Sequence, residues 1–314
     1  MQIIFGPVYS RRFGVSLGVD LSPQMKQCNF DCLYCELAPA QPIAHQTYVV
    51  EVSTIIEELQ KHLNSDIDVI TLTANGEPTL YPYLDELIGQ IDKIKNSIQT
   101  LILSNSATLV DKRVFNALLK LDKVKLSLDA VTPETFKKID RPQKSINIQN
   151  IISALIAFSK VYKGELYIEI LFVKGINDSD EEVQALSDTL LNVKNITRVD
   201  IGTIDRPPAY PVEGLSYDEL YTIAQKFDSS LPLHVTSRKD IKNTQKLFLS
   251  KEELLNTLDK RPLTQEDIES LFDEKTKQIF QELFQEKKIG IKKAGNIEFF
   301  IPKENFTRKR VKNS

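Results

Sequence analysis

The sequence predicts an α/β protein with a partial (β/α)6 barrel followed by a small winged-helix domain. Before residue 240, short apolar runs alternate with stretches that repeat apolar residues every three or four positions. Such alternation is typical of parallel strands joined by right-handed helical crossovers. After residue 240, three helical stretches precede an alternating hairpin, which is the element order of a winged helix. Because six strand–helix units can be counted, we expect an open barrel rather than a closed eight-fold one.

Each predicted strand of the barrel is a short apolar run, and the helix after it carries its apolar residues on one face. The predicted strands are 14–21, 68–73, 100–105, 123–130, 165–173 and 197–204. The predicted helices are 52–63, 83–96, 110–121, 132–139, 147–162, 180–193 and 216–227. Ligands of such barrels bind at the C-terminal ends of the strands, so residues that follow a strand are the candidates for a site.

The change of pattern after residue 240 divides the sequence into three predicted segments. They are a barrel over 1–240, a winged-helix-like domain over 241–302 and a basic tail over 303–314 that we expect to be disordered. In the second segment, Thr264 followed by Asp267 is a helix-start signal. The third helix is expected to end at Gly290, and the hairpin is expected to turn at a Gly-Asn pair.

The composition is typical of a soluble protein, with 41% hydrophobic and 26% charged residues. No apolar run is long enough to predict a membrane span, and the first residues lack the features of a signal peptide, so we expect a cytoplasmic protein. Residues 1–240 carry 24 basic and 31 acidic residues, net −7, whereas residues 241–314 carry 16 and 12, net +4. Any contact with nucleic acid is therefore expected at the C-terminal end.

All three cysteines of the chain, Cys28, Cys32 and Cys35, lie within the eight residues CNFDCLYC. In a reducing compartment, clustered cysteines bind metal or do chemistry more often than they form disulfides. A structural zinc ion would need a fourth ligand, for which His45 is the nearest histidine. A [4Fe–4S] cluster held by three cysteines would leave one iron without a protein ligand. The spacing alone leaves both kinds of site open.

CNFDCLYC resembles the cluster loop of the radical S-adenosylmethionine (SAM) superfamily, C-x3-C-x-aromatic-C, with Tyr34 as the aromatic residue. The resemblance implies a partial (β/α)6 radical SAM barrel, a [4Fe–4S] cluster on the three cysteines, and SAM as a second cofactor. VYSRRFGVSLGVDL, SLDAVTPETFKKIDRP and VKGIND further resemble a substrate-unassigned group related to the wyosine-tRNA synthases. The synthases carry a second cluster on additional cysteines. This chain has no fourth cysteine, which excludes a second cysteine-ligated cluster.

The loop after the second predicted strand, TANGEPTL, resembles the Gly-Gly-Glu-Pro motif of the superfamily. The resemblance implies that Gly76, Glu77 and Pro78 help to hold the amino group of SAM, with Asn75 where the family has glycine. A plain Asn-Gly turn is the alternative interpretation of this loop.

Polar residues after the next two strands complete the cofactor site that the resemblance implies. Ser104 and Asn105 follow the third predicted strand, and Ser127 and Asp129 belong to the fourth. All four would reach the ribose or the carboxylate of SAM. Capping of the next helix is the alternative for Ser104, with Ser106 as an equally good cap, and a solvated strand face is the alternative for Ser127 and Asp129.

The fifth and sixth predicted strands end in segments that resemble further binding regions. In LFVKGIND, Val173 would pack on the adenine ring of SAM and Asn177 would order the turn. In IDRPPAYP, Arg206 would hold a carboxylate of SAM or of the substrate. Arg11 and Arg12 are candidate anion contacts of the substrate, either near the mouth of the pocket or at the bottom of the barrel.

The resemblance also implies a course of reaction. A reduced cluster would pass one electron to SAM, and the 5′-deoxyadenosyl radical formed would abstract hydrogen from a substrate. An electron donor such as flavodoxin or ferredoxin would be a partner. RNA, in particular tRNA, and a peptide or protein recognised by the winged helix are the two substrate hypotheses. A zinc-binding regulator without enzymatic activity is the third alternative.

Overall fold

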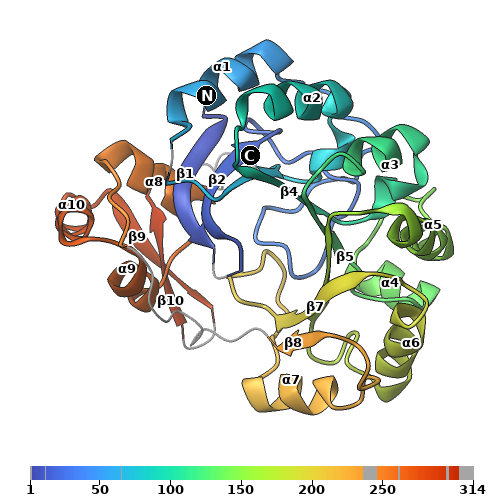
Figure 1. The fold of residues 1–314 in the computed structure, drawn as a ribbon. Coiled ribbons are helices and arrows are strands. Elements are labelled where there is room, and N and C mark those ends of the chain that lie inside the picture. Colours follow the sequence, from blue (N-terminus) through green and yellow to red (C-terminus); the bar gives the residue numbers. More distant parts are fainter. Residues whose placement is uncertain are drawn as a thin grey trace.

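The computed structural model describes residues 2–10, 12–64, 66–235, 246–260, 262–294 and 297–303. Its largest element is an eight-stranded sheet in which the strands follow chain order. The strands are β1 (Ile4–Ser10), β2 (Gly14–Asp20), β3 (Val69–Thr73), β4 (Gln99–Ser104), β5 (Lys123–Ser127), β6 (Glu165–Phe172), β7 (Ile196–Thr203) and β8 (Leu233–Val235). β2 to β8 are parallel and β1 is antiparallel to β2. The sheet curves into an open barrel (Figure 1).

Helices cover the outer face of this sheet (Figure 1). They are α1 (Val52–His62), α2 (Leu84–Ile94), α3 (Lys112–Leu118), α4 (Pro133–Ile139), α5 (Ile148–Val161), α6 (Asp180–Leu190) and α7 (Tyr217–Ala224), with 3-10 turns η1 (Pro78–Leu80) and η2 (Ala107–Val110). The predicted partial barrel is confirmed, and β1 and β8 extend the sheet beyond the six predicted units. No helix in the described ranges is both long and apolar enough to span a membrane.

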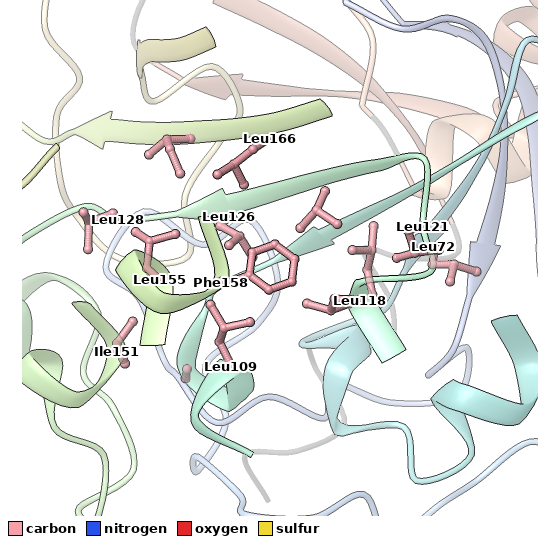
Figure 2. Packing of buried hydrophobic residues seen from close by; sticks show 14 of the residues in the cluster. Leu72, Leu109, Leu118, Leu121, Leu126, Leu128, Ile151, Leu155, Phe158 and Leu166 are labelled. Atoms are coloured by element: carbon pink, nitrogen blue, oxygen red, sulfur yellow. The ribbon is translucent and has the colours of Figure 1, made fainter. Parts of the chain in front are cut away.

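The hydrophobic core between the sheet and its helices explains the apolar periodicity of the sequence. α5 directs Ile151, Leu155 and Phe158 towards Leu126 of β5 and Leu166 of β6 (Figure 2). All five side chains are buried, and burial of each such side chain contributes about 1.5–3 kcal/mol. Leu126 and Leu166 therefore face the outer layer of helices, and the residues that alternate with them along β5 and β6 face the inside of the barrel.

The inner face of the barrel is charged where β5, β6 and β7 meet. Lys125 of β5 lies 2.6 Å from Glu169 of β6, and Asp200 of β7 is fully buried. Arg12, in the turn between β1 and β2, reaches these strands from across the barrel. Its Nη1 atom lies 2.8 Å from Glu169 Oε1 and 2.8 Å from Asp200 Oδ2.

The turn between β1 and β2 therefore fills the end of the barrel at which the strands begin. Phe13 of this turn packs edge-on against Tyr167, with ring centroids 5.0 Å apart. The sequence left two positions open for Arg12, the mouth of the pocket and the bottom of the barrel. The structure places it at the bottom, because it precedes β2 at the end where the parallel strands begin and pairs with Glu169 and Asp200 inside the barrel. Arg11 lies outside the described residues.

The C-terminal segment forms a small module with its own core. It consists of α8 (Lys251–Lys260), α9 (Gln265–Leu271), α10 (Glu274–Gln285), β9 (Ile289–Ala294) and β10 (Ile297–Pro302). This module lies beside β1 (Figure 1). The order of three helices and a hairpin agrees with the sequence pattern, although the assignment as a winged helix, like the domain boundaries, stays a prediction.

Details of this module confirm one expected helix signal and correct another. Thr264 and Asp267 form a reciprocal capping box at the start of α9. The expected helix end at Gly290 was wrong, because α10 stops at Gln285 and Lys287 adopts a left-handed backbone with φ of 57°. Gly290 belongs to β9 instead. The Gly-Asn turn and residues 304–314 of the tail lie outside the described residues.

We expect the Leu155→Ala substitution to lower the free energy of unfolding by about 2–5 kcal/mol, because it leaves a cavity between α5 and the sheet. Lys160→Ala, on the exposed face of the same helix, should change it by less than about 0.5 kcal/mol. Urea unfolding followed by circular dichroism would measure both. Equal effects of the two substitutions would contradict the packing described for α5.

Candidate functional site

A cavity of about 240 Å³ opens at the C-terminal ends of β3 to β5, and Cys28, Cys32 and Cys35 all line it. The loop that carries the cysteines runs between β2 and α1 and lies inside the ring of strands (Figure 1). Six further residues that the sequence singled out also line the cavity: Tyr34, Gly76, Glu77, Ser104, Asn105 and Ser127. The structure therefore brings together, in one cavity, motifs that are far apart along the chain.

The cysteine loop begins with a backbone junction to the loop that follows β3. Gln27 N–H donates to Asn75 O at 2.8 Å, and Glu77 N–H donates to Gln27 O at 3.0 Å. Gly76, between these two bonds, has φ of 132°, and a Cβ atom added to it would lie 2.0 Å from Gln27 O. Only glycine fits this position. Asn75 has no such left-handed backbone, so the departure from the Gly-Gly motif has no steric cost.

The middle of the cysteine loop is held by the chain around β5 and α4. Asp31 N–H and Leu33 N–H donate to the carbonyl oxygens of Asp140 and Ile139. The Tyr34 hydroxyl donates to Asp129. The other carboxylate oxygen of Asp129 accepts from Leu171 N–H at 2.7 Å. Both oxygens of Asp129 are thus used to fix the loop.

A third segment, after β7, closes over the end of the cysteine loop. Ala209 N–H donates to Cys35 O at 2.8 Å, and the Tyr210 hydroxyl donates to Asp31. Arg206 forms an ion pair with Glu36 and does not line the cavity. The predicted role of Arg206 as a carboxylate contact is therefore not what the structure shows, because its guanidinium is engaged by the residue next to Cys35.

Glu77 and Asn105 form a rigid polar wall beside Cys28. Glu77 is buried and accepts from Thr79 N–H at 3.1 Å and from Asn105 N–H at 2.8 Å. Burial raises the pKa of Glu77 despite these bonds. The Asn105 amide donates to Asn29 Oδ1 at 2.7 Å and lies 3.8 Å from Cys28 Sγ. The asparagine side chain therefore faces the thiol.

The predicted serine residues line the cavity, whereas the residues expected at the adenine do not. Ser104 Oγ accepts from Ser106 N–H at 3.1 Å and makes no helix cap. Val173 is fully buried in the core, so its expected packing on an adenine ring is not visible in the structure. Asn177 Oδ1 accepts from Val173 N–H, and Asn177 Nδ2 donates to the carbonyl oxygens of Asp129 and Leu171. These bonds give the expected ordering of the turn.

Several residues of the site were not predicted from the sequence. Asp140 Oδ1 lies 3.4 Å from Cys32 Sγ, and Lys26 lines the cavity beside the thiols while pairing with Asp31 at 3.2 Å. Lys125 and Glu169 form the floor. The alternation of charged and apolar residues in KVKLS is the one pattern from which Lys125 could have been found.

The residues of the cavity fit a [4Fe–4S] cluster. Burial raises the pKa of all three thiols, that of Cys28 to about 12, so thiolates at this place need a cationic partner such as iron. Among the described residues, no three His, Cys, Asp or Glu side chains converge to hold a single ion. Each thiolate of a cluster binds a different iron, so a wider spacing suits it. His45 is exposed and does not line the cavity, which leaves a zinc ion without the expected fourth ligand.

The comparison with protein families decides between these interpretations. Residues 23–186 match the model of the radical SAM superfamily. The chain belongs to the radical SAM superfamily. It is therefore an enzyme of this type, with a [4Fe–4S] cluster and SAM as cofactors, and its chemistry is the radical cleavage of SAM. Enzymes of the superfamily generally need a reductant.

Individual relatives share the family or the fold of this chain. A UPF0026 protein of Helicobacter pylori is 42% identical over 303 residues, which cover 96% of this chain and 97% of that protein, so both chains belong to one family. A solved structure of a radical SAM methyltransferase from Sphaerobacter thermophilus has a TM-score of 0.56 at 16% identity and covers 72% of this chain and 67% of that one. A structure of TYW1 with a lysine–pyruvate adduct has a TM-score of 0.51 at 18% identity, with 72% and 76% covered. These structures show the shared fold.

We expect Gly76→Ala to lower the iron and sulfide content after anaerobic reconstitution and to destabilise the protein by more than about 1–3 kcal/mol, because it adds a steric clash to a strained backbone. Gly89→Ala is the matched control. A Cβ atom on Gly89 of α2 would meet nothing within 4 Å, so this substitution should stabilise by about 0.5–1 kcal/mol and leave cluster content unchanged. Normal cluster content in Gly76→Ala would contradict the inference that this backbone junction positions the cysteine loop.

Glu169 should make the free energy of unfolding depend on pH in the acidic range. Burial alone would raise the pKa of Glu169, but Lys125 and Arg12 outweigh it and lower the pKa from 4.5 to about 2. Its contribution to stability is therefore complete above pH 4.5 and is lost as the pH falls towards 2. In urea unfolding, the difference between the wild type and Glu169→Gln should shrink over this interval. A difference that does not change with pH would contradict the charged network.

Proposed function

We propose that Cys28, Cys32 and Cys35 hold the [4Fe–4S] cluster of this enzyme and that SAM binds beside it at the ends of β3 to β5. The observation that carries the proposal is the opening of all three thiols into one cavity, next to Gly76, Glu77 and Asn105. When bound, the cluster supplies the electron that cleaves SAM to methionine and a 5′-deoxyadenosyl radical, which abstracts hydrogen from the substrate. A cytoplasmic flavodoxin or ferredoxin is the proposed electron donor.

The residues of the cavity suit the parts of SAM to different degrees. The carboxylate of Glu77 is fixed from two sides by Thr79 and Asn105, and an ammonium group beside it would offset the cost of its burial. Ser127 and Asn105 present polar groups to the cavity for the ribose or the carboxylate. Asp129 supports the site indirectly by accepting a hydrogen bond from Tyr34, and Asn177 does so by ordering the turn after β6.

The lining of the cavity also suits a reactive radical. Phe30, Tyr34, Leu37 and Leu103 place apolar surface between the polar groups. The segment after β7 covers the end of the loop through Ala209 and Tyr210. Exclusion of water prevents side reactions of the radical with other hydrogen donors.

RNA, in particular tRNA, is the substrate class that we propose. The C-terminal segment carries the excess of basic residues, and β9 of this segment contacts the site region. Lys292 Nζ lies 3.4 Å from Pro207 O, in the same segment that donates to Cys35 O through Ala209. A phosphate backbone bound by the lysines of this segment would therefore lie near the cavity. A peptide or protein bound by the module is the alternative.

The cluster assignment can be tested by anaerobic reconstitution with iron and sulfide, followed by reduction and addition of SAM. The wild type should give a reduced-cluster paramagnetic resonance signal that SAM alters, and it should form 5′-deoxyadenosine. Cys32→Ala should lose both signals, whereas His45→Ala should keep both. Loss of metal binding in His45→Ala, with stoichiometric zinc in the wild type, would support the zinc-binding regulator instead.

The substrate proposal can be tested by the affinity of the full chain for total tRNA at several salt concentrations. Lys287→Glu with Lys288→Glu should weaken binding and reduce the salt slope by about 2, because both side chains are exposed in the C-terminal module. The matched control is Lys137→Glu with Lys138→Glu on α4, where both lysines are also exposed. Equal weakening by the two pairs would contradict the proposed site, and absence of tRNA binding would favour the peptide alternative.

A further inference from the structure

The floor of the cavity is formed by a lysine and a glutamate that the cluster and SAM do not explain. Lys125 and Glu169 line the cavity below the cysteine loop, and Lys125 Nζ lies 2.6 Å from Glu169 Oε2. The other oxygen of this carboxylate, Oε1, is held by Arg12 at 2.8 Å. The two cations thus bind opposite oxygens of one carboxylate.

This arrangement leaves Lys125 able to take a second partner. Glu169 is its single ion-pair and hydrogen-bond partner among the described residues, so two of its three N–H donors remain available. If the ammonium turned towards a ligand, Arg12 would still neutralise Glu169. A ligand therefore need not leave a carboxylate buried without a partner, which would be costly.

The ion-pair network around the floor contains one more cation than carboxylates. Three cations, Arg12, Lys125 and Arg198, are linked through ion pairs to two carboxylates, Glu169 and Asp200. Inclusion of the neighbouring Lys123–Glu165 pair leaves the excess of one positive charge unchanged. Burial lowers the pKa of Lys125 even though Glu169 opposes the effect. This ion-pair network therefore holds one positive charge in excess, and Asp129, whose carboxylate also acts electrostatically on Lys125, is not part of it.

We propose that Lys125 binds a carboxylate group of the substrate at the floor of the cavity. This inference deepens the proposed function and rests on its radical chemistry, because it assigns the anion to the molecule that gives up hydrogen. RNA offers phosphodiesters and no carboxylate, so the inference concerns the peptide or protein alternative, whose acidic side chains and C-terminus carry this group. A carboxylate carries the single negative charge that the network lacks, whereas a phosphate monoester would leave a negative excess. The reacting carbon then lies between the floor and the cysteine loop, which line the same cavity.

The test uses the cluster-loaded, SAM-bound protein under anaerobic conditions, with propionate, propionamide and inorganic phosphate as probes. A ligand that binds the folded protein raises its thermal unfolding midpoint. We expect propionate to raise the midpoint more than its neutral isostere propionamide and more than phosphate. Equal shifts by propionate and propionamide would overturn the proposal, and a larger shift by phosphate would overturn the assignment to a carboxylate.

Substitutions locate the effect on one side chain. Lys125→Met removes the charge but keeps the length and apolar stem, and it should abolish the difference between propionate and propionamide. Lys123→Met is the matched control, because Lys123 is a buried, ion-paired lysine on the same strand that does not line the cavity. It should keep the difference. Lys125→Arg retains the charge and should also keep part of it, which keeps the test decisive if Lys125→Met folds poorly.

The outcome for the inference is separate from the outcome for the proposed function. If the wild type forms 5′-deoxyadenosine but does not distinguish propionate from propionamide, the anion site is refuted and the radical chemistry stands. If the wild type distinguishes them through Lys125 but does not cleave SAM, the anion site stands and the proposed function is refuted. Retention of the difference in Lys125→Met would assign the anion to another cation and refute the role of Lys125.

Discussion

The backbone junction between Gln27 and Gly76 is the constraint on which the site depends. Two hydrogen bonds join the start of the cysteine loop to the loop after β3, and they require a backbone approach that a side chain at position 76 would block. The same loop places Glu77 where it accepts from the end of β4 through Asn105. One glycine thus ties the thiols to two strand ends, and the cavity exists because these three pieces of chain cannot move independently.

A second constraint is the charged interior of the barrel. The interior of a barrel is usually filled by apolar side chains, but here the inner face carries ions where β5, β6 and β7 meet. Arg12 makes this possible because it enters from the turn between β1 and β2 and bridges Glu169 to Asp200. The result is a plugged lower end and a polar floor below the cysteine loop. A barrel of this construction offers a polar substrate a binding surface that an apolar core would not.

The barrel and the cysteine loop could be predicted because their signals are local. Strands and helices repeat their apolar residues at fixed periods, and Cys28, Cys32 and Cys35 lie within eight residues. The prediction was weaker for residues whose role depends on a distant partner. Arg206 has the chemistry of an anion contact, but Glu36 engages it. Val173 was expected at the adenine ring, yet its side chain belongs to the core. A motif states which residues are near each other along the chain and does not state which way a side chain faces.

The sequence by itself determined the order of strands and helices, the three thiols as a metal-binding set, and the loop of Asn75 to Pro78 as their neighbour at a strand end. These features depend on periodicity and short spacing, which tertiary contacts do not alter. Only the tertiary structure decided that Lys125 and Glu169 face the same cavity as the thiols and that Arg12 balances them from a turn 157 residues away from Glu169. Buried charges are tolerated only where partners from distant strands meet them, and such meetings are set by the curvature of the sheet and by no pattern within a single segment.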